Sequence, residues 1–341
     1  PLYVGNGVSN TFNVNDGTVS AANFRVGHGT GVTGTLSQSG GTINAGTYLI
    51  IGGVGGVSSG TGVYNLSGTG QLNTNQLYCG WAARGEIYQT AGTITTNLLH
   101  SATDSVLGGR YELSGGTLNV TGTSGTAQLG YRYTTDFLHT GGNANFKNLE
   151  LGSGYSGGAG TANYTISGTG QLTIAPGGHF YVGGNNGGTG NFYVNGGTSL
   201  VNANMYVGAN TNTTGTVTQT AGSVTVAPGS ELRLANAPSA TGTYEIQGGT
   251  LNTPDFRMGY GNGSAGTVTQ SGGTVNVANY VILGASGTGT GTYNMNGGAL
   301  DIANYDLYLG WGDTSSGTVN QAAETLALGG FTSDRVQSTC V

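Results

Sequence analysis

Apolar and polar residues alternate in short segments along the whole chain, and three kinds of segment follow one another in a fixed order. The first three segments place apolar residues at Leu2 and Val4, at Phe12 and Val14, and then at Val19. Successive side chains of a strand point to opposite faces, so this period of two predicts short strands with one buried face. No stretch has the spacing of an amphipathic helix, and the predicted fold class is therefore all-β.

Together the three segments form a block of roughly 25 residues that recurs about thirteen times, which is typical of stacked repeats. Two clear copies begin at Met205 and Arg257, and both contain the sequence Gly-Thr-Val-Thr-Gln. We predict a single-stranded parallel β-helix, or β-solenoid, with about 13 coils of three short strands and three corners. The loose coil length favours the right-handed form by analogy. The predicted solenoid is continuous over residues 1–330, and residues 331–341 form a C-terminal tail.

The inward positions of the second segment occur in two forms. One form pairs an aromatic ring with an aliphatic residue, as in Tyr244 and Ile246. The other pairs a smaller aliphatic residue with glutamine, as in Val217 and Gln219. We interpret this exchange as volume compensation inside a narrow core. Because a buried amide needs partners, each glutamine is expected to bond the backbone at the Gly-Gly corner that follows, and a polar channel is the alternative interpretation.

The blocks between Leu99 and Phe146 match the repeat least well. They contain residues with reactive or ligand-type side chains, namely His100, Ser101, Asp104 and His139. This region is therefore the first place to expect a kink in the stack or a functional site.

The charge balance excludes two classes of partner. The 341-residue chain carries 8 Lys and Arg against 14 Asp and Glu, for a net charge of -6. It lacks the basic footprint of a nucleic-acid-binding protein and the polybasic patch of a membrane-surface protein. No apolar run approaches the ~20 residues that a membrane span requires. No signal peptide precedes the first segment, so the chain is interpreted as a mature or trimmed product.

Residues with catalytic or metal-binding potential are sparse. Cys79 lies at an inward strand position and is expected to be a small buried hydrophobe, while Cys340 lies outside the repeat. The acidic residues are scattered, and the densest group, Asp301, Asp306 and Asp313, is interpreted as a solvated end. Carbohydrate-cleaving enzymes need clustered carboxylates, and no metal-ligand spacing joins the histidines. We therefore expect no enzyme activity, no catalytic residue, no metal and no cofactor.

One outward column differs from the Thr, Asn and Ser surface around it, because it is rich in aromatic and arginine side chains. Exposed rings and arginines are favoured at protein interfaces, and flat rings also stack on sugars. The column is thus a candidate for lateral protein contact or glycan binding, and a plain ladder of rings and arginines across coils is the alternative. This lateral face comprises Tyr78, Trp81, Tyr181, Tyr206, Arg233, Arg257, Tyr260, Tyr308 and Trp311.

The repeat Gly-Thr-x-x-Gln-(Ser/Thr)-Gly-Gly-Thr-Val-x-Val resembles the repeats of bacterial secreted and surface β-solenoid proteins. These include autotransporter passenger domains and adhesin-like proteins rich in Gly, Thr and Asn. The resemblance covers nearly the whole chain, from Pro1 to about Gly330. It implies an extracellular or cell-surface location, and it names no ligand, because such repeats carry adhesins, matrix components and some enzymes.

The ends of the predicted stack suggest how the protein assembles. An uncapped β-helix end presents unpaired backbone groups, which allows identical chains to stack head to tail as a homopolymer. The leading hypothesis is therefore a structural extracellular filament or biofilm-matrix fibre. The alternative is a monomeric cell-surface adhesin whose lateral face binds extracellular polysaccharide or cell-surface glycans, and a polysaccharide lyase or hydrolase ranks third. The expected stacking residues are Leu2, Tyr3 and Val4 at one end and Leu326, Leu328 and Phe331 at the other.

Overall fold

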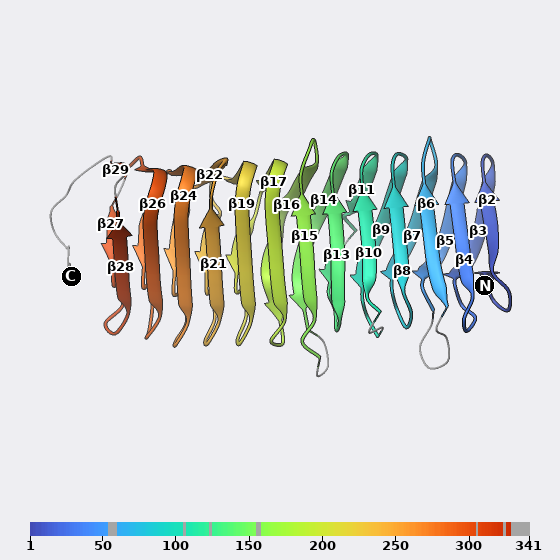
Figure 1. The fold of residues 1–341 in the computed structure, drawn as a ribbon, viewed down its shortest axis with the longest axis horizontal. Coiled ribbons are helices and arrows are strands. Elements are labelled where there is room, and N and C mark those ends of the chain that lie inside the picture. Colours follow the sequence, from blue (N-terminus) through green and yellow to red (C-terminus); the bar gives the residue numbers. More distant parts are fainter. Residues whose placement is uncertain are drawn as a thin grey trace.

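The computed structural model describes residues 1–53, 60–104, 107–122, 125–154, 158–304 and 306–322, together with the backbone of one further strand, Thr325–Leu328. All regular structure in these residues is strand, and the coils lie side by side along a rod (Figure 1). Every pairing joins parallel strands, and the strands form one continuous sheet. The stack makes about 12 turns, so the predicted all-β parallel β-helix is confirmed. The predicted boundary at residue 330 and the tail 331–341, with Phe331 and Cys340, lie outside the described residues.

Each coil has three faces, in the order of the three sequence segments. Strands confined to the first face are β1 (Leu2–Val4), β12 (Thr126–Leu129), β18 (Asn204–Val207), β20 (Glu231–Leu234), β23 (Asp255–Met258), β25 (Val281–Leu283) and β27 (Leu307–Leu309). Strands confined to the second face are β2 (Asn10–Val14), β4 (Thr33–Gln38), β6 (Thr61–Leu66), β8 (Gly85–Gln89), β10 (Gly109–Leu113), β13 (Thr134–His139), β15 (Thr161–Ile166), β21 (Thr241–Ile246) and β28 (Ser316–Gln321). Strands confined to the third face are β11 (Thr117–Val120), β22 (Thr250–Thr253) and β29 (Thr325–Leu328).

Many strands continue round a corner, so two of the three predicted segments of a coil often form one strand in the structure. Strands that run from the third face onto the first face of the next coil are β3 (Thr18–Val26), β5 (Thr42–Ile51), β7 (Gln71–Cys79), β9 (Thr93–Ser101), β14 (Asn143–Ser153) and β16 (Gln171–Asn185). Strands that run from the second face onto the third are β17 (Thr189–Val201), β19 (Thr214–Val226), β24 (Ala265–Val277) and β26 (Thr290–Ile302).

The interior is a narrow column in which inward residues of neighbouring coils lie directly over one another. The register aligns Tyr111 with Ile87 on one side and with Phe137 on the other. The rings of Tyr111, Phe137 and Tyr164 stack with centroids 4.7 and 4.6 Å apart. All three rings are fully buried, and burial of apolar surface at about 25 cal/mol per Å² is the main force that holds coil on coil.

The buried glutamines bond the corner backbone, as the sequence predicts. Gln219 Nε2 donates to the carbonyl of Gly222 at 3.3 Å and to that of Thr250 at 3.0 Å. Its Oε1 accepts a hydrogen bond from the Tyr244 hydroxyl of the next coil at 2.8 Å. Volume compensation is therefore not the whole explanation of the two forms. A coil with a buried glutamine is also followed by a coil whose buried tyrosine donates a hydrogen bond to that glutamine. The same bond joins the pairs Gln38 and Tyr64, Gln89 and Tyr111, and Gln270 and Tyr293.

His139 takes the place of a glutamine in this pattern. Its Nδ1 lies 3.0 Å from the Tyr164 hydroxyl, and its Nε2 lies 3.1 Å from the carbonyl of Gly142. Burial lowers the pKa of His139 and favours the neutral ring, which suits a side chain with one donor and one acceptor. The described coils between Leu99 and Phe146 also keep an unbroken pairing register along β10 and β13, so the irregular sequence there produces no kink in these strands.

Candidate functional site

The pairing register places the outward middle residues of the first face in one column, one residue per coil. This confirms the alignment inferred from the sequence. From the N-terminal coil onward the column contains Tyr3, Arg25, Ile50, Tyr78, His100, Gln128, Glu150, Tyr181, Tyr206, Arg233, Arg257, Ile282 and Tyr308.

A second group of rings lies beside this column, one residue past the corner glycine. Gly80 and Gly310 both adopt positive φ, at 80° and 74°, and so turn the chain at the end of the first face. The turn brings Trp81 against Tyr78, with ring centroids 4.5 Å apart, and Trp311 against Tyr308, with centroids 4.7 Å apart. The lateral face is therefore two side chains wide.

Parts of the lateral face form the ladder that was the alternative interpretation. The guanidinium carbon of Arg233 lies 4.1 Å from the ring centroid of Tyr260 and 5.7 Å from that of Tyr206. The rings of Tyr181 and Tyr206 meet edge to face at 5.3 Å. These contacts stabilise the face across coils, and an exposed cation–π contact contributes about 0.5–1 kcal/mol. Trp311, in the last coil whose side chains the structure describes, contacts Tyr308 of its own coil and is 60% exposed.

Carboxylates on the first face compensate the charges of Arg233 and Arg257. Glu231 forms an ion pair with Arg233 on its own strand. Its Oε2 also lies 3.1 Å from Nε of Arg257 in the next coil. Asp255 contributes a second carboxylate, 3.9 Å from Nη2 of Arg257, and the same nitrogen donates to the Tyr280 hydroxyl at 2.6 Å. Neither guanidinium is left without an opposite charge.

A buried glutamate in the column was missed, because the sequence showed only scattered acids. Glu150 is 7% exposed and accepts hydrogen bonds at Oε2 from Gln128 at 3.0 Å, Ser153 at 2.8 Å and Asn185 at 3.2 Å. His179 Nε2 lies 3.1 Å from its Oε1. Burial acts to raise the pKa of Glu150, but the bonds from His179, Gln128 and Ser153 outweigh it, and the pKa falls below its usual value. The partners come from three successive coils, so only the register brings them together.

Two coils before this glutamate, His100 is an uncharged member of the column. Burial lowers the pKa of His100 to about 4, against a smaller upward effect of the Glu150 charge. Its ring stacks on Tyr131 with centroids 5.0 Å apart and meets Tyr78 edge to face at 5.3 Å. A neutral imidazole packed between two rings supports the ladder and gives no sign of a catalytic pair.

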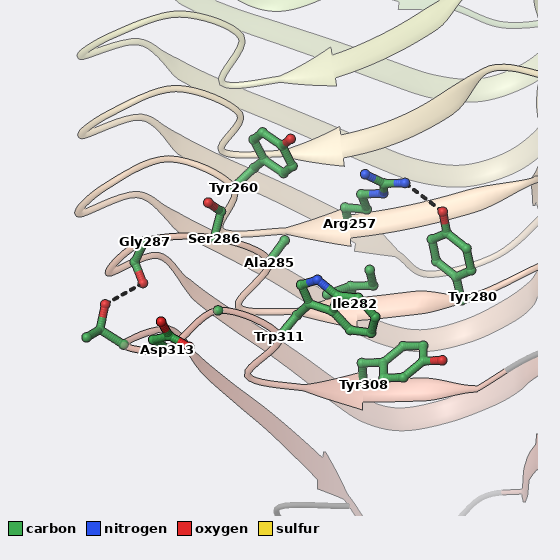
Figure 2. Close-up of a pocket in the computed structure, with 12 residues that line it drawn as sticks. Arg257, Tyr260, Tyr280, Ile282, Ala285, Ser286, Gly287, Tyr308, Trp311 and Asp313 are labelled. Atoms are coloured by element: carbon green, nitrogen blue, oxygen red, sulfur yellow. Dashed lines mark hydrogen bonds between the residues drawn. The ribbon is translucent and has the colours of Figure 1, made fainter. Parts of the chain in front are cut away.

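A groove crosses the lateral face near its C-terminal end (Figure 2), with a volume of about 820 Å³. The β25 coil forms the floor of the groove. Its residues there, Ile282 and Ala285, are smaller than those of the neighbouring coils and are each 6% exposed. The coils on either side carry larger residues at the same two positions, and these form the walls. Arg257 and Tyr260 stand on one side, and Tyr308 and Trp311 stand on the other. Polar residues complete the lining, namely Tyr280, Ser286, Asp313 and Thr314.

The predicted stacking residues lie on strands at the two ends of the described stack. Leu2, Tyr3 and Val4 form β1, which pairs with β3 on one side. Tyr3 is 38% exposed, whereas Val4 is 2% exposed. Leu326 and Leu328 lie on β29, whose backbone pairs with β26 at Leu300 and Ile302.

The described residues contain no group of three His, Cys, Asp or Glu side chains arranged for a metal ion. The thiol of Cys79 is 1% exposed, and burial raises its pKa to about 12, as expected of a structural cysteine. In the part of the chain that the structure describes, no helix has the length and hydropathy to cross a membrane. No protein-family model, curated protein or solved structure matches the chain.

Proposed function

We propose that the protein is a structural rod of an extracellular fibre or matrix, in which the end coils of one chain stack on those of the next. The observation that carries the proposal is that each coil pairs in parallel with the next along the described stack, so a coil edge offers the backbone groups that a further coil would use. Leu2 and Phe12 point into the core but are only partly buried. Their counterparts one coil further on, Phe24 and Leu36, are 0% exposed. An added coil would bury the first pair in the same way.

At the C-terminal side, the structure describes side chains only as far as residue 322. Leu307, Leu309 and Val319 pack against the core but remain partly buried. Parallel pairing of each coil with the next recurs along the rod, with local register shifts near the corners, so a second chain could continue it with the same kind of backbone bonds. Such a head-to-tail contact does not close on itself and grows into a fibre, adding one coil per ~4.8 Å.

Electron microscopy of the purified chain tests the proposal. We expect uniform fibres many times longer than a single rod. Leu2→Lys places a charge inside the open edge, a natural way to block edge pairing, and should leave dispersed rods. Val8→Lys is the matched control, because Val8 is 69% exposed between β1 and β2, and its fibres should persist. Short rods from the unsubstituted chain, or fibres that tolerate Leu2→Lys, would contradict end stacking.

The length of the native polypeptide tests what lies next to the first described coil. If mass spectrometry of the native protein finds one longer polypeptide that supplies the next coil, the first described coil lies at an internal position of that chain. Homopolymer formation is then wrong, although the rod remains structural. We assign no reaction to the rod, and release of products from a panel of polysaccharides would overturn that assignment.

A second candidate function is glycan binding by a cell-surface shaft. The observation that favours it is the groove lined by Tyr260, Tyr308 and Trp311, which combines aromatic side chains with a few polar ones. This function does not require the ends to stack, and it is compatible with a monomeric rod as well as with a fibre.

A further inference from the structure

We propose that the groove of the β25 coil binds one pyranose ring of an uncharged polysaccharide between Tyr260 and Trp311. The inference deepens the second candidate function, glycan binding, and it is independent of end stacking. It assigns one site and one ligand class to a face that otherwise holds rings and arginines packed on each other. The geometry, the chemistry of the lining and the charge each support it separately.

The spacing of the walls suits a six-membered ring. The Trp311 amide donates to the carbonyl of Gly284 at 2.9 Å, and the Ala285 amide donates to that of Gly259 at 3.0 Å. Tyr260, Ala285 and Trp311 are thus the same position in three successive coils, and the outer two backbones are about 9.6 Å apart. A flat ring in contact on both faces needs roughly 7–8 Å, at 3.5–4.0 Å per contact. The small Ala285 between them leaves that space open (Figure 2).

The lining matches the two sides of a sugar. A pyranose has C–H faces that pack on aromatic rings and a rim of hydroxyls that require hydrogen bonds. Tyr260, Trp311 and Ile282 supply the apolar contact, and pockets of this kind add a few placed polar groups. The Thr314 hydroxyl donates to the carbonyl of Gly287 at 2.8 Å and keeps its lone pairs as acceptors. Ser286 and the exposed Asp313 carboxylate lie at the same end of the groove.

Charge selects an uncharged ligand over an acidic one. Arg257 is the cation that lines the groove, and the carboxylates of Glu231 and Asp255 already compensate it. Asp313 adds a negative group at the opposite end. A uronic acid would therefore meet repulsion from Asp313 without gaining an uncompensated cation, whereas a neutral sugar meets neither effect.

The chain provides its own control at Trp81. Trp81 also contacts a tyrosine of its own coil, but its ring is tilted by 35° to that of Tyr78, whereas Trp311 meets Tyr308 edge to face at 84°. Its indole Nε1 donates to Asp104 at 3.1 Å, and the ring is partly covered. Trp81 and Trp311 are the only two tryptophans of the chain, so Trp81→Phe leaves Trp311 as the sole indole fluorophore.

Fluorescence titration of the full-length Trp81→Phe chain tests the site. The probes are glucan and mannan hexasaccharides and, as the acidic counterpart, a galacturonate hexamer. We expect a saturable change in Trp311 emission with at least one neutral hexasaccharide and weaker binding of the acidic one. Ala285→Leu fills the groove, and Tyr260→Leu removes one wall. Each should raise the Kd at least tenfold while circular dichroism shows an unchanged fold.

Calorimetry of the unsubstituted chain supplies the reference, and its Kd should agree within twofold with that of Trp81→Phe. Neutral-sugar binding that survives both groove substitutions would sink the assignment of the site but leave glycan binding intact. Tighter binding of the galacturonate hexamer would overturn the ligand class. No binding of either neutral hexasaccharide would remove both this inference and the second candidate function, while fibre formation would stand or fall on its own test.

Discussion

Tyrosine has different roles in the interior column and on the lateral face. Inside, Tyr244 and Tyr293 are fully buried, and each hydroxyl donates to a glutamine of the preceding coil. On the face, Tyr206 and Tyr260 pack against Arg233 and remain partly exposed. The interior hydrogen bond favours a tyrosine in the coil that follows a glutamine, because a buried polar group without a partner costs about 1–3 kcal/mol of folding free energy. The face contact contributes about 0.5–1 kcal/mol, which leaves its residues available for binding.

The difference teaches that stability and recognition are carried by separate columns of one repeat. Interior positions tolerate little change, because each inward side chain lies between two neighbours with the same register. Outward positions on the first face vary from Arg to Ile to Tyr with the backbone pairing intact. Substitutions can therefore test the separation, and we expect the cost to fall steadily from the corners to the face.

The largest effect is expected at the corner glycines. A Cβ added to Gly208 would lie 2.4 Å from the Thr241 carbonyl oxygen of the next coil, so Gly208→Ala should cost more than about 4 kcal/mol or prevent folding. Gly229 is the matched control, because it has a similar φ of +83° but no atom within 4 Å of such a Cβ. Gly229→Ala should cost only the left-handed strain of about 1–2 kcal/mol. Urea unfolding measures both, and equal costs would show that close coil approach is unimportant.

The next effect is expected in the interior pair of Gln219 and Tyr244. Gln219→Leu removes the partner of the Tyr244 hydroxyl and of two corner carbonyls, and should cost about 3 kcal/mol. Tyr244→Phe should cost about 1 kcal/mol. A double-mutant cycle by urea unfolding should show coupling of at least about 0.5 kcal/mol, because the two groups share a bond. Strict additivity of the two costs would refute the paired-coil explanation.

An intermediate effect is expected at Glu150, which is buried although it belongs to the outward column. Glu150→Gln should cost about 2 kcal/mol at pH 7, because bonds from Gln128, Ser153 and Asn185 to a charged acceptor are lost or weakened. The pKa of Glu150 is lowered in the folded chain, so its contribution is present above the unfolded carboxyl pKa of about 4.3 and is lost as the pH falls through the folded pKa.

Urea unfolding between pH 7 and pH 3 checks this sign. The difference in unfolding free energy between the unsubstituted chain and Glu150→Gln should be constant near neutrality and shrink at acid pH. Glu112→Gln is the control, because Glu112 is an outward and more exposed carboxylate on the second face, and its difference should be small throughout. A Glu150 difference that grows on acidification would show that burial, rather than hydrogen bonding, dominates its ionisation.

The smallest effect on stability is expected for the groove wall. Tyr260→Leu removes the ring beneath Arg233 and should cost at most about 1 kcal/mol. Thermal unfolding should therefore be almost unchanged in the same variant that loses sugar binding. A large loss of stability would show that Tyr260 contributes to folding as much as the interior tyrosines do, and would contradict the proposed difference between the two columns.

The sequence by itself determined the coil. Alternation at a period of two and a recurring block are local patterns, and they were enough to predict the three faces, the buried position of Cys79 and the bonding of Gln219 to its corner. The lateral column was also predictable, since every first segment supplies one outward residue. The resemblance to secreted β-solenoids suggested a setting, and that setting remains a prediction.

Only the tertiary structure decided which outward residues meet. The partners Gln128 and His179 are 22 and 29 residues from Glu150, because the coils between them differ in length. The groove likewise depends on Ile282 and Ala285 falling between two coils with large side chains. A burial pattern within one segment is set by that segment alone, but a contact between coils depends on the summed length of every corner and loop in between. Side-chain contacts between coils are therefore the property that the sequence pattern left open and that the folded rod supplied.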